Sequence, residues 1–295
     1  MEVVVTALGP DHSGLADPII HHVTSRGARI AEIQMYDHDE RELFSMLCRM
    51  DLDDEGDASK QLLKLQSEMT QIGDHTGLAV RAWSRDARPS RPRIAVAGTY
   101  VEHTPRAVLQ AAKDGMLQAE IPVLISNRKK LRYLADEFDC HFEMIGDGSG
   151  LADNDALVRT LDEMDIDYLV LARYMRVLPA EICWQFAGGR IINLHHGLLP
   201  GFPGFRPYHD AHNARMLTFG ATCHFIIPEL DAGNQTINQR TFAVSPGQSI
   251  ESIIKQGETE NEPACLVEGV RRVVDCEVQL HFHRVVPTKR AMVAT

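Results

Sequence analysis

The run Ile191–Pro200 contains two side chains whose types and spacing suit acyl chemistry. A β-branched stretch typical of a buried strand ends in Asn193 and His195, with one residue between them. Alternate residues of a strand point to the same side, so we expect the amide and the imidazole to face one space. There an amide can stabilise an oxyanion and an imidazole can move a proton. Downstream, Asp231 could orient the imidazole and favour its charged form, although a structural histidine and a turn aspartate would fit the same pattern.

Strands and helices alternate after residue 93, and this alternation predicts the sheet that positions the two side chains. Such a pattern is typical of a parallel sheet covered by helices on both faces. Ligands of open α/β sheets bind beyond the carboxyl ends of the strands, where Asn193 and His195 fall. We expect strands at Arg93–Ala97, Ile121–Ser126, Cys140–Ile145, Tyr168–Ala172 and Arg190–Leu194, and helices near 105–117, 128–138, 152–164 and 179–186.

The C-terminal part has a different pattern, in which strand-like segments surround one long helical segment. We expect strands at Ala221–Ile227 and Thr236–Ala243, one long helix over Ser249–Cys276, and a final strand over Val278–Val286. His209 and His212 fit the surface of a short helix better than a metal site, because no third ligand is spaced with them.

The segment before residue 84 follows a compact βαββαβ order, which predicts a four-stranded sheet with two helices on one face. Gly9–Gly14 reads as a turn that opens the first helix, with Asp11 or Ser13 as its cap. We expect strands at Glu2–Leu8, Arg29–Tyr36, Glu42–Asp51 and Gly77–Trp83, with one helix ending near Ser25 and another over Ala58–Ile72. Residues 84–92 have linker composition, so we predict domains at 1–83 and 93–295.

Composition excludes several classes of partner and site. The formal net charge of −11 is a poor match for a nucleic-acid binder, which needs a basic face. The six cysteines are scattered, which argues against a structural zinc site and a disulfide framework. We find neither a signal segment nor an apolar run long enough for a membrane span, so we expect a cytoplasmic protein without a membrane partner.

Four segments in the same order resemble the folate-dependent formyltransferase fold, and in detail the formyltetrahydrofolate deformylase family. The Asn-x-His-His spacing at 193–196 is one of them. The others are Tyr174-Met175-Arg176-Val177-Leu178, Arg206-Pro207-Tyr208-His209 and Leu230-Asp231-Ala232-Gly233. The N-terminal module resembles an ACT domain through Pro10-Asp11-x-x-Gly14. The resemblance implies an α/β protein: a ferredoxin-like ACT module followed by an open, mostly parallel, Rossmann-like formyltransferase domain.

The resemblance also implies a reaction and a set of site residues. The substrate would be 10-formyltetrahydrofolate, hydrolysed to formate and tetrahydrofolate without a bound cofactor or metal. Asn193 and a protonated His195 would stabilise the tetrahedral oxyanion, and Asp231 would tune His195 and order the water. His196 would face the other side of the strand, as a core residue or a support of the site. Substrate-binding positions would be Met175, Arg176, Val177, Leu178, Gly204, Thr222, His224 and Gly233.

Two segments bear on the identity of the formyl acceptor. Family members that act on a phosphorylated amine carry a Gly/Ser-rich loop after the first strand, whereas Ala97–Pro105 contains Tyr100 and Glu102 and should repel a phosphate. This favours water or an unphosphorylated amine. The polar segment 234–239 replaces the family's apolar one, and its glutamine falls one residue late. A residue inserted in a strand moves the side chains that follow it to the opposite face, so we expect the folate pocket to be reshaped here. Two alternatives are that the enzyme acts on a modified folate or that it transfers the formyl group to an amine.

The ACT-like module allows two further hypotheses. It could bind an amino-acid effector near Asp11 and Gly14, or it could form the surface through which the chain becomes a homo-oligomer; we favour the second. A non-catalytic folate-binding sensor is a third interpretation of the whole chain, and the intact set of Asn193, His195 and Asp231 argues against it.

Overall fold

The computed structural model describes residues 1–38, 42–53, 56–87, 91–227 and 235–293, which form two compact units. The first comprises Met1–Arg91 together with Leu178–Gly188, and the second comprises Pro92–Val177 together with Gly189–Thr295. None of the helices in the described residues is long and apolar enough to cross a membrane.

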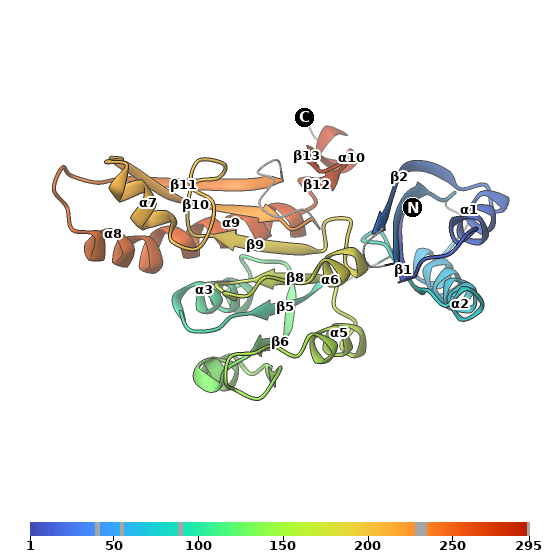
Figure 1. The fold of residues 1–295 in the computed structure, drawn as a ribbon, viewed down its shortest axis with the longest axis horizontal. Coiled ribbons are helices and arrows are strands. Elements are labelled where there is room, and N and C mark those ends of the chain that lie inside the picture. Colours follow the sequence, from blue (N-terminus) through green and yellow to red (C-terminus); the bar gives the residue numbers. More distant parts are fainter. Residues whose placement is uncertain (39–41, 54–55, 88–90, 228–234, 294–295) are drawn as a thin grey trace. The chain divides into compact units, whose positions relative to one another are not determined.

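The first unit is the predicted βαββαβ module (Figure 1). Its strands pair antiparallel in the order β2-β3-β1-β4, and two helices supply the apolar side chains that pack on one face. The elements are β1 (Glu2–Pro10), α1 (Ala16–Ser25), β2 (Arg29–His38), β3 (Leu43–Asp51), α2 (Ala58–Thr76) and β4 (Ala79–Trp83).

The start of α1 differs from the prediction. The residue before the helix is Leu15, and no side chain caps it, so the expected cap by Asp11 or Ser13 is wrong. Instead the Asp11 amide donates to the Glu42 carbonyl at 2.7 Å, which fastens the turn to the neighbouring strand connection. Gly14 has φ +85°, a conformation that favours glycine and extends the turn before the helix begins.

The second face of this sheet is covered by Leu178–Gly188, which includes α6 (Ala180–Gln185). Trp184 is 6% exposed among Val4, Leu8 and Leu47, and its ring lies 6.3 Å from that of Tyr36. Two buried polar side chains of the sheet bind backbone carbonyls of the segment: Thr6 donates to Gln185 at 3.0 Å, and Arg49 donates to Gly188 at 3.2 Å. The sequence pattern predicts the helix at 179–186 but not this packing.

We expect Trp184→Ala to destabilise the first unit by about 3 kcal/mol, since it empties a large buried site on the sheet. Urea unfolding followed by circular dichroism measures the change. The matched control is Leu63→Ala, which truncates a side chain that is 65% exposed on α2. Equal unfolding midpoints for the two variants would contradict the packing described here.

The second unit contains a seven-stranded sheet in the order β11-β10-β9-β8-β5-β6-β7 (Figure 1). Five neighbouring strands, from β9 to β7 in this order, run parallel as predicted, whereas β10 and β11 are antiparallel additions. The strands are β5 (Arg93–Ala97), β6 (Glu120–Ser126), β7 (His141–Met144), β8 (Tyr168–Leu171), β9 (Ile191–His195), β10 (Thr218–Phe225) and β11 (Thr236–Ala243). The helices α3 (His103–Lys113), α4 (Arg132–Phe138), α5 (Asn154–Glu163) and α7 (Pro207–Asn213) connect them.

The expected long C-terminal helix is interrupted. A π-helical turn, Gly257–Asn261, separates α8 (Ile250–Gln256) from α9 (Glu262–Val274). Gly257 is required at this turn because a Cβ would overlap the Tyr208 hydroxyl. The expected final strand is wrong: β12 (Val278–His281) and β13 (Arg284–Pro287) form a hairpin. Its turn residues Phe282 and His283 have φ of 44° and 57°, which a continuous strand does not allow.

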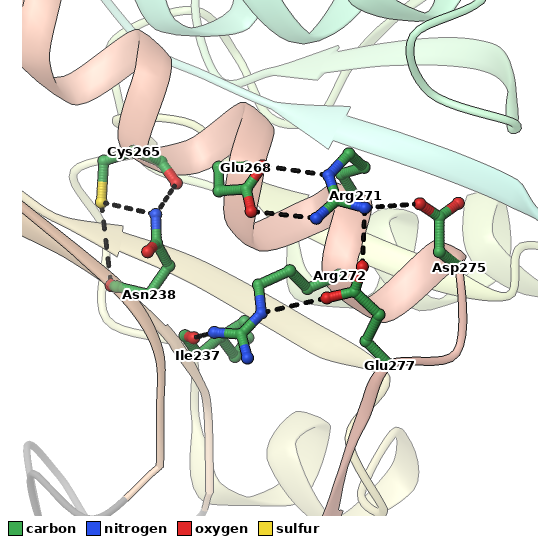
Figure 2. Close-up of polar contacts among 8 residues, drawn as sticks. All are labelled: Ile237, Asn238, Cys265, Glu268, Arg271, Arg272, Asp275 and Glu277. Carbon is green, nitrogen blue, oxygen red and sulfur yellow. Dashed lines mark hydrogen bonds and ion pairs between the residues drawn. The ribbon is translucent and has the colours of Figure 1, made fainter. Parts of the chain in front are cut away.

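Helix α9 covers one particular face of the sheet. A Cβ on Gly269 of α9 would overlap the Cys223 side chain, so the helix lies directly on Cys223. Cys223 is paired with Leu194, and both therefore point toward α9, whereas Asn193 points to the opposite face. Asn238 donates to the Cys265 carbonyl at 3.2 Å, and Arg272 donates to the Ile237 carbonyl, which ties α9 to β11 (Figure 2). Arg271 binds Glu268, Asp275 and Glu277 at the end of the same helix.

Candidate active site

Asn193 and His195 lie at the carboxyl end of β9, as the sequence predicts. Parallel pairing with β8 aligns Asn193 with Leu171, and antiparallel pairing with β10 aligns it with His224. His195 is 7% exposed and is paired with Thr222. The side chains of these paired residues occupy one face at the end of three neighbouring strands, so Asn193, His195, Thr222 and His224 share a face.

A hydrogen bond fixes the amide of Asn193. Its Nδ2 atom lies 3.1 Å from His224 Nε2, and His224 Nδ1 lies 3.0 Å from the Phe225 carbonyl oxygen. A carbonyl only accepts, so the hydrogen of neutral His224 is on Nδ1, and Nε2 accepts from the amide. Asn193 Nδ2 then keeps a second N–H for another acceptor. This chain orients the amide as a donor, which is the role that an oxyanion requires.

The imidazole of His195 is also oriented by backbone. Its Nε2 atom lies 2.7 Å from the Phe202 carbonyl oxygen, so this nitrogen carries a hydrogen. The loop between the two residues passes close to the ring: a Cβ on Gly197 would lie 2.9 Å from His195 Nε2. Glycine at 197 therefore keeps the space that the ring occupies.

Thr222 binds the loop after β9. Its hydroxyl donates to the Gly197 carbonyl at 2.8 Å and accepts from the Leu199 amide at 3.0 Å. Gln239 donates to the same hydroxyl at 3.1 Å and to the Leu199 carbonyl at 2.7 Å. Thr222 is fully buried, so the network positions the loop beside His195.

The other predicted substrate-binding positions are spread over several segments. Met175 and Val177 are exposed at 42% and 57%, and Met175 has φ 56° in the loop after β8. Arg176 is exposed in the same loop, whereas Leu178 is buried and belongs to the first compact unit. Gly204 has φ 90° in the exposed loop before α7. Asp231 and Gly233 lie outside the described residues.

The polar segment that follows Gly233 enters β11 with an irregular register. Cys223 is paired with Asn238, but the next residue, His224, is paired with Thr236, which leaves Ile237 as an extra residue. A residue inserted in this way is a β-bulge, and it re-aims the neighbouring side chains. Gln235 is buried just before it, and its carbonyl accepts from the Phe225 amide at 3.0 Å.

The loop after β5 is tied to its neighbours rather than open. The Thr99 hydroxyl donates to the Tyr174 carbonyl and lies 2.9 Å from Asn127 Oδ1, and both side chains are fully buried. Tyr100 is 43% exposed, and the guanidinium of Arg128 lies 5.0 Å from its ring centre. The loop thus carries a bulky ring at the position where a phosphate-binding loop needs free backbone amides.

A buried polar cluster that sequence reasoning missed lies at the ends of β8 and β9. Arg173 Nη2 lies 2.6 Å from Glu258 Oε1, and its Nε lies 3.4 Å from Glu262 Oε2. Tyr208 donates to Glu262 Oε1 at 3.0 Å, and its ring centre lies 6.0 Å from that of His196. These residues come from four separate segments. An arginine directly after an apolar strand was a usable signal, whereas nothing in the helical sequence singled out Glu262.

Burial sets the protonation of this cluster. Burial raises the pKa of the Glu262 carboxyl to about 6, with Arg173 and Tyr208 opposing the shift. Burial and the nearby Arg173 charge lower the pKa of His196 to about 3, so this ring is neutral at physiological pH. His196, which the sequence predicts to be a core residue or a support of the site, is thus an uncharged residue beside His195.

The remaining predicted positions lie on other segments of the chain. Asp11 and Gly14 are exposed in the turn of the first unit, and His12 Nε2 lies 3.3 Å from the Thr76 carbonyl oxygen. His209 and His212 lie on α7. Within the described residues no three His, Cys, Asp or Glu side chains converge as a metal site.

A mostly parallel sheet with an oriented amide and imidazole at one strand end defines an α/β enzyme domain, here preceded by a βαββαβ module. Residues 92–270 match the family model "Formyl transferase", and residues 2–81 match the model "ACT domain". The chain therefore belongs to the formyl transferase family and carries an N-terminal ACT domain, as the motifs predict.

Some relatives cover nearly the whole chain, and others cover about two thirds of it. The formyltetrahydrofolate deformylase of Synechocystis sp. is 29% identical over 279 residues, which are 94% of this chain and 95% of that protein. The formyltetrahydrofolate deformylase of Escherichia coli O6:H1 is 34% identical over 195 residues, which are 65% of this chain and 69% of that protein. A crystal structure of a Pseudomonas syringae formyltetrahydrofolate deformylase matches with a TM-score of 0.64 and 25% identity, covering 98% of this chain and 95% of the other. A crystal structure of a glycinamide ribonucleotide transformylase from Symbiobacterium toebii matches with a TM-score of 0.62 and 25% identity, covering 68% of this chain and 96% of the other.

We expect Glu262→Gln to change how stability depends on pH. The pKa of Glu262 is raised from 4.5 to about 6 in the folded state. The contribution of this carboxyl to the free energy of unfolding is therefore fully present below pH 4.5 and is lost as pH rises through about 6. Glutamine mimics the protonated form, so stability relative to wild type should increase by about 2 kcal/mol between pH 4.5 and pH 7. The lowered pKa of His196 changes stability with pH in the opposite direction. This effect is present in both the wild type and the variant, so it largely cancels when the two are compared. Urea unfolding at both pH values measures it, and a pH-independent difference would contradict the assignment.

Proposed function

We propose that the protein hydrolyses 10-formyltetrahydrofolate to formate and tetrahydrofolate. The observation that carries the proposal is the Asn193 amide, oriented as a donor by His224 beside a buried His195 at the end of β9. The deformylase names of relatives that cover nearly the whole chain support the same reaction.

The geometry supports a defined sequence of steps. Water adds to the formyl carbon, and the resulting oxyanion receives hydrogen bonds from Asn193 Nδ2 and from protonated His195. Asp231 favours the charged form of His195 and orders the attacking water. Collapse of the tetrahedral intermediate breaks the bond from carbon to N10, which takes a proton relayed by His195 and water. Asp231 enters as a proposal from the sequence, since it lies outside the described residues.

We infer that the folate lies on the face shared by Asn193, Thr222 and His224. Met175, Arg176 and Val177 border it from the loop after β8, and Gly204 borders it from the loop before α7. Gly233 lies outside the described residues and enters as a proposal from the sequence. Leu178, at the end of the loop after β8, is also proposed to bind the folate. His224 would contribute by orienting the Asn193 amide. The β-bulge at Ile237 lies on the strand that enters this face, which supports a pocket whose shape differs from the family's usual one.

For the ACT domain we infer two roles, with self-association weighed above effector binding. The turn Asp11–Gly14 is exposed and offers backbone groups to an amino acid. An edge strand, β2, carries the exposed side chains Met35 and Tyr36, which suits pairing between copies of the chain.

We expect the purified chain to release formate from 10-formyltetrahydrofolate, measured as formate and as the absorbance change of the folate. Asn193→Ala removes one oxyanion donor and should lower kcat about 100- to 1000-fold. Asp231→Asn should give a similar loss if that carboxylate tunes His195. Glu120→Gln, on the amino-terminal end of β6, is the matched control and should retain wild-type turnover. Equal rates for wild type and Asn193→Ala would refute the assigned chemistry.

Amino acids distinguish the two roles of the ACT domain. An effector that binds the folded state must raise the melting temperature with increasing concentration. If the turn binds one, Asp11→Ala should abolish the shift without changing formate release in its absence. No shift with any amino acid, together with a dimer by light scattering, would leave self-association as the role.

A further inference from the structure

The loop after β8 carries three of the proposed folate-binding residues, and it begins on a strained stretch of backbone. Arg173 and Met175, on either side of Tyr174, have φ of 61° and 56°. These values lie in the left-handed region, which is costly for residues with side chains and persists only where the surrounding structure holds it. Met175, Arg176 and Val177 are exposed in this loop. Their placement therefore depends on what holds the backbone at Tyr174.

The buried hydroxyl of Thr99 holds that backbone. It donates a hydrogen bond to the Tyr174 carbonyl, and the Thr99 side chain is fully buried. The close approach of the loops after β5 and β8 requires glycine at 98, because a Cβ there would lie 3.2 Å from the Ala172 carbonyl oxygen. Since the Tyr174 carbonyl belongs to the peptide group that precedes Met175, the bond fixes the point at which the exposed residues begin.

Asn127, directly after β6, connects this bond to a second support. Its Oδ1 atom lies 2.9 Å from the Thr99 hydroxyl oxygen, so the hydroxyl hydrogen is shared between this oxygen and the Tyr174 carbonyl. The Nδ2 atom of Asn127 donates to the Gly150 carbonyl at 2.7 Å, which fixes the end of the amide that faces Thr99 as the acceptor. Asn127 is fully buried, so loss of either bond would leave a buried polar group without a partner.

Gly150 supports the guanidinium group of Arg176. A Cβ added at Gly150 would overlap the Arg128 guanidinium and would lie 3.0 Å from Arg176 Nη2, so both guanidinium groups lie against this glycine. The Asn127 amide therefore supports the loop after β8 twice: through the Thr99 hydroxyl at its backbone, and through Gly150 at a side chain.

We propose that Asn127 and Thr99 are positioning residues of the reaction, which hold residues 174–177 in the conformation that binds the folate. The inference rests on the proposed function and deepens it, because it assigns a role in substrate affinity to two side chains that act through the loop. In this assignment the loop after β5 supports another loop of the site, whereas a Gly/Ser-rich loop at the same place offers free backbone amides to a phosphate.

The groups assigned to the chemical step are held by other bonds. His224 orients Asn193, and the Phe202 carbonyl orients His195. Neither bond involves Asn127 or the residues that it supports. Loss of the Asn127 contacts should therefore weaken folate binding and leave the chemical step nearly unchanged, which is measured as a higher KM at an unaltered kcat.

Thr99→Val tests the inference, because it removes the hydroxyl and keeps the volume of the side chain. We expect KM for 10-formyltetrahydrofolate to rise about 10-fold in the formate-release assay, with kcat within about 2-fold of the wild-type value. Thr99→Ser retains the hydroxyl and should restore a KM close to that of the wild type. Thr160→Val is the matched control, because this buried hydroxyl also donates to a backbone carbonyl, that of Ala156 on α5 at 2.7 Å. Both constants should stay unchanged in the control.

A pair of glycine variants tests the second support without changing a buried polar side chain. Gly148→Ala and Gly150→Ala both place a methyl group at positive φ, 82° and 109°. Only the methyl group at 150 meets the two guanidinium groups, whereas the nearest neighbour at 148 is Met144 Sδ at 3.9 Å. We expect Gly150→Ala to raise KM several-fold and Gly148→Ala to leave it close to the wild-type value.

The outcomes separate the inference from the proposed function. A folded Thr99→Val with the KM of the wild type, or with a lower kcat at unchanged KM, would overturn the positioning role while the wild type still releases formate. Equal KM values for Gly150→Ala and Gly148→Ala would also overturn it, and this pair decides the question if Thr99→Val does not fold. Absence of formate release by the wild type would instead overturn the proposed function, and with it the inference.

Discussion

The alternation of side chains along β9 is the constraint on which the site depends. The last three residues of β9 are Asn193, Leu194 and His195, and strand geometry sends Asn193 and His195 to one face and Leu194 to the other. In the proposed reaction the first face presents donors to the formyl group, while the second face contacts α9. A register slip of one residue would exchange the two faces. The antiparallel pairing with β10 prevents this, because His224 must lie opposite Asn193 for their hydrogen bond to form.

Buried charge on the α9 side has a cost that apolar packing would avoid. Arg173 and Glu262 are almost fully removed from water, and a buried ion pair often stabilises no more than well-packed hydrophobic residues would. Removal of one partner is nevertheless expensive, since the other charge remains buried and unpaired. A cluster of this kind is therefore sensitive to the loss of any single member.

Sequence patterns predicted what depends on local periodicity. The parallel strands, the βαββαβ module and the position of Asn193 at a strand end follow from alternation and turn residues. Long-range packing was not predictable in the same way: Trp184 packs on the sheet formed by residues 2–83, and Glu262 meets Arg173 across a large sequence separation. The hairpin at 278–287 was missed because Phe282 and His283 adopt φ values that their residue types rarely indicate. Of the predicted site residues, Asn193, Thr222 and His224 lie together, whereas Leu178 belongs to the other unit.

Adjacent histidines at a reactive centre raise the question of which one takes the proton. The ring centres of His195 and His196 are 5.7 Å apart, close enough for one charge to oppose the other. Arg173 lies on the side of His196, where its charge and the surrounding burial lower the pKa of that imidazole to about 3. His196 is therefore neutral at physiological pH, and in the proposed reaction the proton is moved by His195, the ring that shares a face with the Asn193 amide. Arg173 and burial thus keep the neighbouring imidazole neutral on the face away from the Asn193 amide.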